Sequence, residues 1–151
     1  MQTSSRFAVA IHVLALNLLA QAEDGWMTSE QMAASVNTNP VVVRRIMGSL
    51  RRAGLVESQP GPGGGWRLLR RPEQMTLLDV YRAVDGDRGL PRHHRPPNPN
   101  CAVGRHMERA LDGFFREAEA AMERKLAEVT VAEVVRTILG ACGARPQQAA
   151  D

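Results

Sequence analysis

Seven arginines lie between residues 44 and 71, and this segment is the part of the sequence best suited to binding a polyanion. The segment contains one acidic residue, Glu57, so its local net charge is +6, whereas the whole chain of 151 residues carries only +3. Guanidinium groups bind phosphates and the edges of guanine, so a basic segment of this kind predicts a nucleic-acid-binding surface. These residues are Arg44, Arg45, Arg51, Arg52, Arg67, Arg70 and Arg71.

The cysteines are the second group of residues with chemistry of their own. Cys101 stands directly before a predicted helix and close in sequence to Arg92 and Arg95. A helix N-terminus and nearby cations lower the pKa of a thiol, which predicts a redox-sensitive cysteine. The alternative is a half-buried cysteine with a structural role only. The other cysteine, Cys142, has no indicated role, and two cysteines are too few for a disulfide framework.

A metal site is the other use of these residues. Cys101 with His12, or with His93 and His94, has the donor types that iron accepts. An iron–sulfur cluster normally needs four protein ligands, mostly thiolates, and Cys101 alone cannot hold one. We therefore expect no cofactor and no metal ion, with His93 and His94 in solvent and His12 a partly buried polar residue at an interface.

Two short predicted helices position the first arginines. One is expected over 29–35, with Thr28 and Gln31 forming a capping box, and Asn37-Thr38 makes a tight connection after it. The next begins at Pro40 with Asn39 as its N-cap. Two short helices joined by such a turn predict a helix-turn-helix, whose second helix enters the major groove.

A predicted β-hairpin follows at once. Strands are expected over 55–58 and 66–69, separated by a Gly- and Pro-rich loop over 59–65. A helix-turn-helix followed by a hairpin predicts a winged helix. A further helix over 77–84, capped by Thr76 with Asp79, completes this part.

Candidate DNA contacts come from these elements. Arg44 and Arg45 can each reach a guanine edge with two N–H groups, whereas Val41 and Val42 can only make apolar contacts, for example with a thymine methyl. Thr28 and Ser29 can offer hydroxyl or backbone N–H groups at a helix start to a phosphate, and Arg67 supplies positive charge at the base of the wing. Arg51 has the alternative role of complementing a helix dipole. The predicted contacts are Thr28, Ser29, Asn39, Val41, Val42, Arg44, Arg45, Ser49, Arg51, Gly63, Gly64 and Arg67.

Three longer apolar patterns predict helices that join two subunits. A first helix over 4–22 is apolar around most of its girth, as expected at a dimer interface. Another runs from Ala102 to Ala127 and needs a partner for its apolar stripe, of which a second copy is the simplest. A last helix is expected over 131–139, capped by Thr130 with Glu133. The predicted dimerisation residues are Met107, Leu111, Phe114, Ala118 and Met122.

The predicted organisation is a winged helix-turn-helix domain over 1–86, a sensor or linker loop over 87–101, dimerisation helices over 102–140 and a disordered tail over 141–151. The fold class is mainly α, with a small β-hairpin wing and a long C-terminal dimerisation helix. The sequence has no secretory signal and no apolar run long enough for a membrane span, which favours a cytoplasmic protein. It also lacks the residue sets of an enzyme active site.

Four segments together resemble the Rrf2 family of bacterial transcription regulators. They are Ser5–Ala8, the stretch over 39–56 that ends Leu-Arg-Arg-Ala-Gly-Leu-Val, the Gly-Pro-Gly-Gly-Gly-Trp-Arg-Leu wing over 61–68, and the helix-bearing segment over 75–84. The resemblance covers residues 1–139 in the same order. It implies a homodimeric winged helix-turn-helix protein whose long helix crosses that of its partner. Several members sense iron–sulfur clusters, nitric oxide, redox state or cysteine metabolism.

The chain departs from this family pattern at three points. Cluster-binding members have three cysteines before the long helix, where this chain has only Cys101. Pro60 replaces a frequent wing arginine, and Val42 replaces a frequent aromatic residue, so the base preference of another member cannot be transferred. Some members recruit a ligand from the first helix, which keeps a cluster-dependent sensor with Cys101 and His12 as an alternative.

The sequence thus predicts a DNA-binding regulator, acting as a repressor on an inverted-repeat operator as a homodimer. Its partners are double-stranded DNA, a second copy of the chain and a small-molecule or oxidant effector, with no membrane. A winged-helix adaptor that acts through protein contacts is the other alternative, but adaptors need no basic strip.

Overall fold

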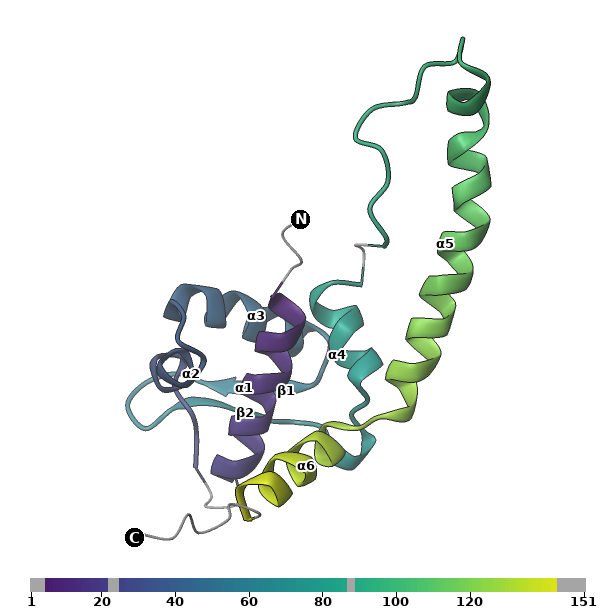
Figure 1. Ribbon diagram of the computed structural model, residues 1–151. Coiled ribbons are helices and arrows are strands. Elements are labelled where there is room, and N and C mark those ends of the chain that lie inside the picture. The colour runs from purple at the N-terminus through teal and green to yellow at the C-terminus, as the bar shows by residue number, and fades with distance from the viewer. Residues whose placement is uncertain (1–4, 22–24, 87–88, 144–151) are drawn as a thin grey trace, which may run out of the picture.

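Helix α1 (Arg6–Gln21) runs through the middle of the molecule and contacts elements on several sides. The computed structural model describes residues 5–21, 25–86 and 89–143. The other elements are α2 (Ser29–Val36), α3 (Pro40–Arg52), β1 (Val56–Gln59), β2 (Gly65–Leu68), the 3-10 helix η1 (Pro72–Gln74), α4 (Leu77–Val84), α5 (Ala102–Glu128) and α6 (Val131–Gly143). Figure 1 shows α5 extending far beyond a body formed by the remaining elements. The predicted fold class, mainly helical with one small antiparallel hairpin, is confirmed.

The hydrophobic core lies between α1, α3 and the elements that follow α3. Val13 and Leu14 of α1 are completely buried, as are Met47 and Leu50 of α3. Val80 of α4 joins them from the opposite side. Because α3 buries this whole face in the core, its other face is left to solvent, which fixes the direction in which the helix can meet a ligand.

The predicted helix caps are confirmed. The Thr28 backbone N–H donates to Gln31 Oε1 at 2.8 Å, and the Gln31 N–H donates to Thr28 Oγ1 at 3.2 Å. Asn39 Oδ1 accepts from the Val41 N–H at 2.8 Å and so begins α3. Between the two helices, Asn37 takes the left-handed conformation with φ 57°, which turns the chain from α2 into α3. The capping boxes at the starts of α4 and α6 are also present.

The hairpin differs from the prediction by one residue in each strand. The predicted strand starts at 55, but the carbonyl of Leu55 accepts from the N–H groups of Leu69 and Arg70, outside the ladder. The ladder instead pairs Val56 with Leu68 and continues to Gln59 and Gly65. The loop is therefore shorter than predicted.

Two small features were not predicted. Met27 pairs with Trp66 through two backbone hydrogen bonds of 3.0 and 2.8 Å, which adds a one-residue edge to the hairpin. The helix η1 also follows the wing and leads into α4. The first depends on a contact between residues 39 positions apart in sequence, and the second is a single short turn that begins at Pro72. Neither produces a periodic pattern in the sequence.

The C-terminal prediction is wrong in part. Helix α6 continues to Gly143, so the first residues of the expected tail over 141–151 are helical. Residues 144–151 lie outside the described residues, as do Ser4 and Ala22 at the predicted ends of the first helix. Helix α5 also ends one residue later than predicted, at Glu128. Among the described helices, none is both long and apolar enough to cross a membrane.

The girth of α1 is covered mostly by its own chain. It packs against α2, α3, α4, α6 and β2. The rings of Phe7 and Tyr81 form a T-shaped pair with their centroids 5.4 Å apart. Of its large apolar side chains, Leu19 remains 41% exposed. The apolar circumference that suggested a dimer interface is thus explained chiefly by burial within one subunit.

Candidate nucleic-acid interface

The outer face of α3 presents two valines and two arginines to solvent. Val41 is 45% exposed and Val42 39%, which is high for apolar side chains in a folded body. Arg44 and Arg45 are exposed beside them. This is the N-terminal half of the second helix of a helix-turn-helix, the part that reads base edges in the major groove.

Arg44 is held by a carboxylate of the preceding helix. Its Nη2 lies 2.5 Å from Glu30 Oε1 of α2, and both side chains are exposed. The hydrogen bond from Arg44 keeps the pKa of Glu30 below its ordinary value. Arg45, by contrast, has no side-chain hydrogen bond or ion pair among the described residues, so its guanidinium is available to a ligand.

The wing arginine sits between an aromatic ring and a carboxylate. Arg67 lies directly opposite Glu57 in the hairpin, with its Nε 2.5 Å from Glu57 Oε1. Its guanidinium also lies over the ring of Trp26, 4.5 Å from the centroid, a cation–π contact. The position of this positive charge at the base of the wing is therefore fixed by two neighbours.

The glycines of the wing loop are required by the hairpin itself. Gly61 and Gly63 have φ of 88° and 75°, a region that other residues rarely adopt. A Cβ on Gly64 would lie 2.1 Å from the carbonyl oxygen of Gln59, so any side chain there would force the loop open. The predicted close approach of Gly63 and Gly64 to DNA is untested, whereas their role in the turn is evident.

A second tryptophan joins the wing to the helix-turn-helix. The Nε1 of Trp66 donates to the Ser29 hydroxyl at 3.1 Å, and Arg51 lies over the same ring at 5.9 Å. Arg51 also donates to the Ser58 hydroxyl of β1 at 3.0 Å. Trp26 and Trp66 are the only two tryptophans of the sequence, and neither was predicted to hold an arginine of the basic segment, although Trp66 lies within that segment and Trp26 precedes it.

Two predicted contact residues turn their hydroxyls inward. Ser49 is only 7% exposed, and its hydroxyl donates to the Arg45 carbonyl and accepts from Arg52. Ser29 is 5% exposed and faces Trp66. The hydroxyl of Thr28 accepts the capping hydrogen bond from Gln31. The side chains of Ser29 and Ser49 are thus buried within the protein and do not face the solvent in which DNA would bind.

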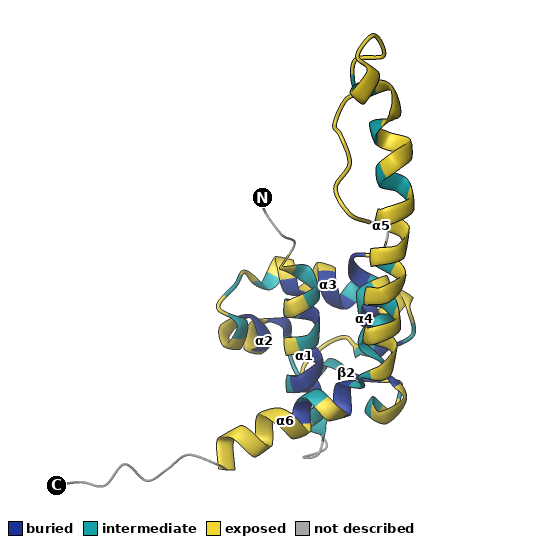
Figure 2. Cartoon of the chain, turned by 45° about the vertical axis from the view of Figure 1, so that its right-hand side comes forward, coloured by how far each residue is buried: buried dark blue, intermediate teal, exposed yellow. Residues whose placement is uncertain are grey.

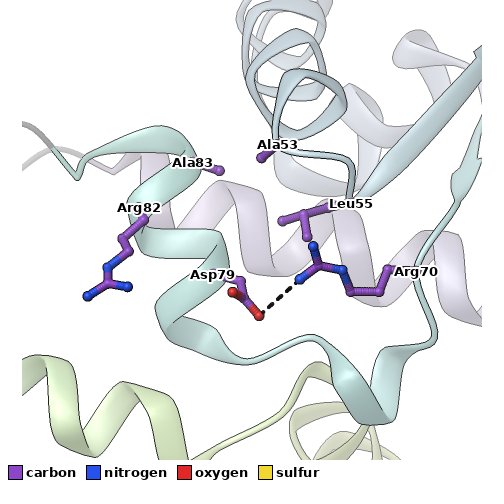
Figure 3. Close-up of a pocket in the computed structure, with 6 residues that line it drawn as sticks. All are labelled: Ala53, Leu55, Arg70, Asp79, Arg82 and Ala83. Atoms are coloured by element: carbon purple, nitrogen blue, oxygen red, sulfur yellow. Dashed lines mark ion pairs between the residues drawn. The ribbon is translucent and has the colours of Figure 1, made fainter.

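The last arginines of the basic segment are paired within the chain. Arg70 Nη1 lies 3.3 Å from Asp79 Oδ2 in a pocket of about 240 Å³ lined by Ala53, Leu55, Arg70, Asp79, Arg82 and Ala83. Figure 3 shows Arg70 and Asp79 facing one another while Arg82 points away. Arg82 instead contacts Glu123 of α5 at 2.7 Å. The Arg70–Asp79 pair therefore connects the segment after the wing to α4, and the Arg82–Glu123 pair connects α4 to α5.

The predicted sensor residues are not gathered in one place. Cys101 is exposed at the N-terminus of α5, at the end of this helix farthest from the body (Figure 1). The backbone N–H groups of Gly104 and Val103 stabilise its thiolate and hold the pKa of Cys101 below its ordinary value. His12 lies in α1, where its Nε2 is 3.1 Å from the Ser35 hydroxyl.

The surroundings of Cys101 and of the loop histidines bear on whether one chain offers an iron site. His93 and His94 are exposed in the loop before α5, near Cys101 in sequence but with no further thiolate. Within the part of the chain that the structure describes, no three His, Cys, Asp or Glu side chains are placed to hold a metal ion. The described residues of one subunit therefore do not bring together the donor set of an iron–sulfur cluster.

The loop over 89–100 is fastened to one side of α5. Arg92 Nη1 lies 2.7 Å from Asp112 Oδ1, and its guanidinium lies over the ring of Phe115 at 5.8 Å. The N–H of Leu90 donates to Glu119 Oε1 at 2.6 Å. The predicted dimerisation residues Met107 and Leu111 lie on a different side of α5, beside Phe114 and Ala118, and are of intermediate exposure.

Another side of α5 is apolar and uncovered. Val103 is 64% exposed, Phe114 71% and Met122 40%, and Ala118 is exposed between Phe114 and Met122. Figure 2 shows that most of α5 is exposed, in contrast to α1, which is mostly buried or of intermediate exposure. A single subunit leaves these side chains in water.

Comparison with known proteins shows which family the chain is similar to. A model of the Rrf2 family, described as an iron-dependent transcriptional regulator, matches residues 3–137. The chain belongs to the Rrf2 family. Among individual Rrf2 relatives, YwnA of Bacillus subtilis strain 168, named as an HTH-type transcriptional regulator, is 42% identical over 132 residues, covering 87% of this chain and 96% of YwnA.

Solved structures agree with the Rrf2 assignment. A crystal structure described as that of a DNA-binding protein has 40% sequence identity and a TM-score of 0.64, covering 86% of this chain and 98% of the other. CymR, the global cysteine regulator of B. subtilis, shares the fold at 21% identity with a TM-score of 0.63, covering 91% and 98% of the two chains. The chain is accordingly an Rrf2-family transcriptional regulator that binds DNA, and not an enzyme.

Proposed function

We propose that this Rrf2 protein acts in the cytoplasm as a homodimer, binds an inverted-repeat operator and represses transcription from it. The observation that carries this proposal is the solvent-exposed outer face of α3. There Val41, Val42 and Arg45 lie free at the start of a helix whose opposite face is buried. This arrangement suits base reading in the major groove, with Arg67 of the wing at a neighbouring phosphate.

The uncovered face of α5 supports the dimer. Burial of a side chain as large as Phe114 stabilises an interface by roughly 1.5–3 kcal/mol. The same face offers Val103, Ala118 and Met122 along one helix. A second copy would supply an identical face, and a two-fold symmetric protein reads two half-sites arranged as an inverted repeat.

The effector is proposed to act through the loop and N-terminus of α5. Cys101 is exposed and its thiolate is stabilised by backbone N–H groups, which favours reaction with an oxidant. A small molecule is the other candidate effector. A cluster shared by Cys101 and the partner's His12 remains the alternative sensor, and an adaptor that contacts proteins is the alternative to DNA binding.

Enrichment of duplexes from a random-sequence pool tests the central proposal. The purified protein is expected to select an inverted repeat, and a reporter promoter that contains this repeat is expected to be repressed. Arg45→Ala should relax the base preference at one position in each half-site. Arg136→Ala removes one exposed positive charge from α6 and serves as the control. Failure to select any duplex would contradict DNA binding by this face, and activation of the reporter would contradict repression.

A further inference from the structure

Two arginines of the proposed interface are already bound to carboxylates in the free protein. Arg44 of α3 pairs with Glu30 of α2, and Arg67 of β2 pairs with Glu57 of β1, each at 2.5 Å. The two pairs come from different elements, one from the helix-turn-helix and one from the wing. All four side chains are at least 36% exposed, so neither pair is required to neutralise a buried charge.

We infer that Glu30 and Glu57 weaken sequence-independent DNA binding by occupying Arg44 and Arg67, and that Glu30 is a specificity determinant because Arg44 can bind guanine without leaving it. This inference rests on the proposed function, because it assigns a role within the same DNA-binding surface. It adds two acidic residues that a search for basic contacts alone would overlook.

A phosphate and a guanine edge bind a paired arginine differently, and this difference explains the expected preference for specific DNA. A phosphate and a carboxylate need the same N–H groups of a guanidinium, so a phosphate of arbitrary DNA must displace the glutamate. The displaced carboxylate then remains close to the phosphate and repels it. A guanine edge carries no net charge and uses only two of the five N–H groups of an arginine. Arg44 can therefore bind guanine while part of its guanidinium still faces Glu30.

The exposure of the pairs allows this exchange to occur. Ion pairs between solvent-exposed side chains are weak and are screened by salt, so DNA can open them without unfolding the protein. Arg67 keeps its contact with the Trp26 ring at 4.5 Å when Glu57 is displaced. The arginine then stays at the base of the wing and needs only to change its hydrogen-bond partner.

Variants that remove one carboxylate at a time test this inference. Duplexes enriched by the wild-type protein provide the specific probe, and a random-sequence duplex of equal length provides the non-specific probe. With Glu30→Gln or Glu57→Gln, the affinity for the random duplex is expected to rise about tenfold. The dependence of log affinity on log salt should become steeper by about one per subunit, because one more arginine meets a phosphate. The ratio of specific to non-specific affinity should fall for Glu30→Gln and stay unchanged for Glu57→Gln, because Arg67 meets a phosphate in both duplexes.

Glu128→Gln is the matched control. Glu128 forms an exposed pair with Lys125 at 2.9 Å near the end of α5, so this variant also loses one negative charge and one ion pair. Equal effects of the three substitutions would show that only net charge matters and would overturn the inference. Weaker binding of both probes by Glu30→Gln would also overturn it, since Glu30 would then support Arg44. If the wild-type protein selects no duplex, the proposed function fails first, before any variant is compared.

Discussion

The indole Nε1 of Trp66 donates a 3.1 Å hydrogen bond to the hydroxyl of Ser29, and this contact joins the wing to the first residue of α2. Next to it, the backbones of Trp66 and Met27 exchange two hydrogen bonds. The wing is therefore attached to the helix-turn-helix by side chain and backbone together. A wing fixed in this way presents Arg67 at a constant position relative to α3.

Trp66→Phe is expected to lower the free energy of unfolding by about 1–2 kcal/mol, because it leaves the hydroxyl of Ser29 without its donor at a nearly buried site. Urea denaturation followed by circular dichroism measures this loss. Trp26→Phe is the matched control, since it keeps a ring below Arg67 and removes no described indole hydrogen bond. An equal change in both variants would show that loss of ring size, and not of the hydrogen bond, is responsible.

Gly65→Ala is expected to destabilise the protein and to weaken DNA binding. The φ of Gly65 is 150°, and a Cβ there would lie 2.6 Å from the carbonyl oxygen of Met27. The wing would have to move away from the helix-turn-helix. Gly113→Ala in α5 meets no atom within 4 Å and should instead stabilise the helix by roughly 0.5–1 kcal/mol. Thermal unfolding of both variants checks the opposite signs, and a neutral Gly65→Ala would argue against the close approach.

The sequence predicted features that depend on neighbouring residues. The cap of α2 requires only Thr28 and Gln31, three residues apart, and such local hydrogen bonds follow from residue type and spacing. The N-cap of α3 at Asn39 was predicted in the same way. The exposure of Arg44 and Arg45 agrees with their selection as candidate DNA contacts.

Contacts across longer separations were not predictable in this way. The hydrogen-bond donor to the Ser29 hydroxyl is Trp66, 37 residues away in sequence. The residues next to Ser29 therefore do not indicate that its hydroxyl faces inward. Ser49 stands at the edge of the exposed face of α3, and Arg52 folds over it. The pairing of Arg44 with Glu30 depends on the angle between α2 and α3. The turn at Asn37 sets this angle, and its value is known only from the structure.

The thiol of Cys101 is expected to react with iodoacetamide at lower pH than an ordinary cysteine. The N–H groups of Gly104 and Val103 favour the thiolate, so the pKa of Cys101 is lowered and the reactive form persists as the pH falls. The rate is measured against pH in Cys142→Ser protein, where Cys101 is the remaining cysteine. The same protein unfolded in urea gives the unperturbed profile. Coinciding folded and unfolded profiles would remove the basis for an oxidant sensor at Cys101.

Phe114→Glu is expected to convert a dimer into a monomer. Phe114 is 71% exposed in a single subunit, so the substitution should cost the isolated fold little. In a dimer it would place two carboxylates at an apolar interface, where an unpaired charge is strongly unfavourable. Sedimentation velocity should show a monomer with an unchanged circular dichroism spectrum. Each monomer would contact one half-site, so affinity for the selected inverted repeat should fall by at least about a hundredfold.

Ala127→Glu is the control for this substitution. It adds the same charge to an exposed position of α5 that the helical repeat of 3.6 residues per turn places well away from Phe114. This variant is expected to remain a dimer and to bind the repeat normally. If Phe114→Glu also sediments as a dimer, the exposed apolar face of α5 is not the interface. The subunits would then meet elsewhere, and Leu19 of α1 with Ile138 and Leu139 of α6 are further exposed apolar side chains that could form the contact.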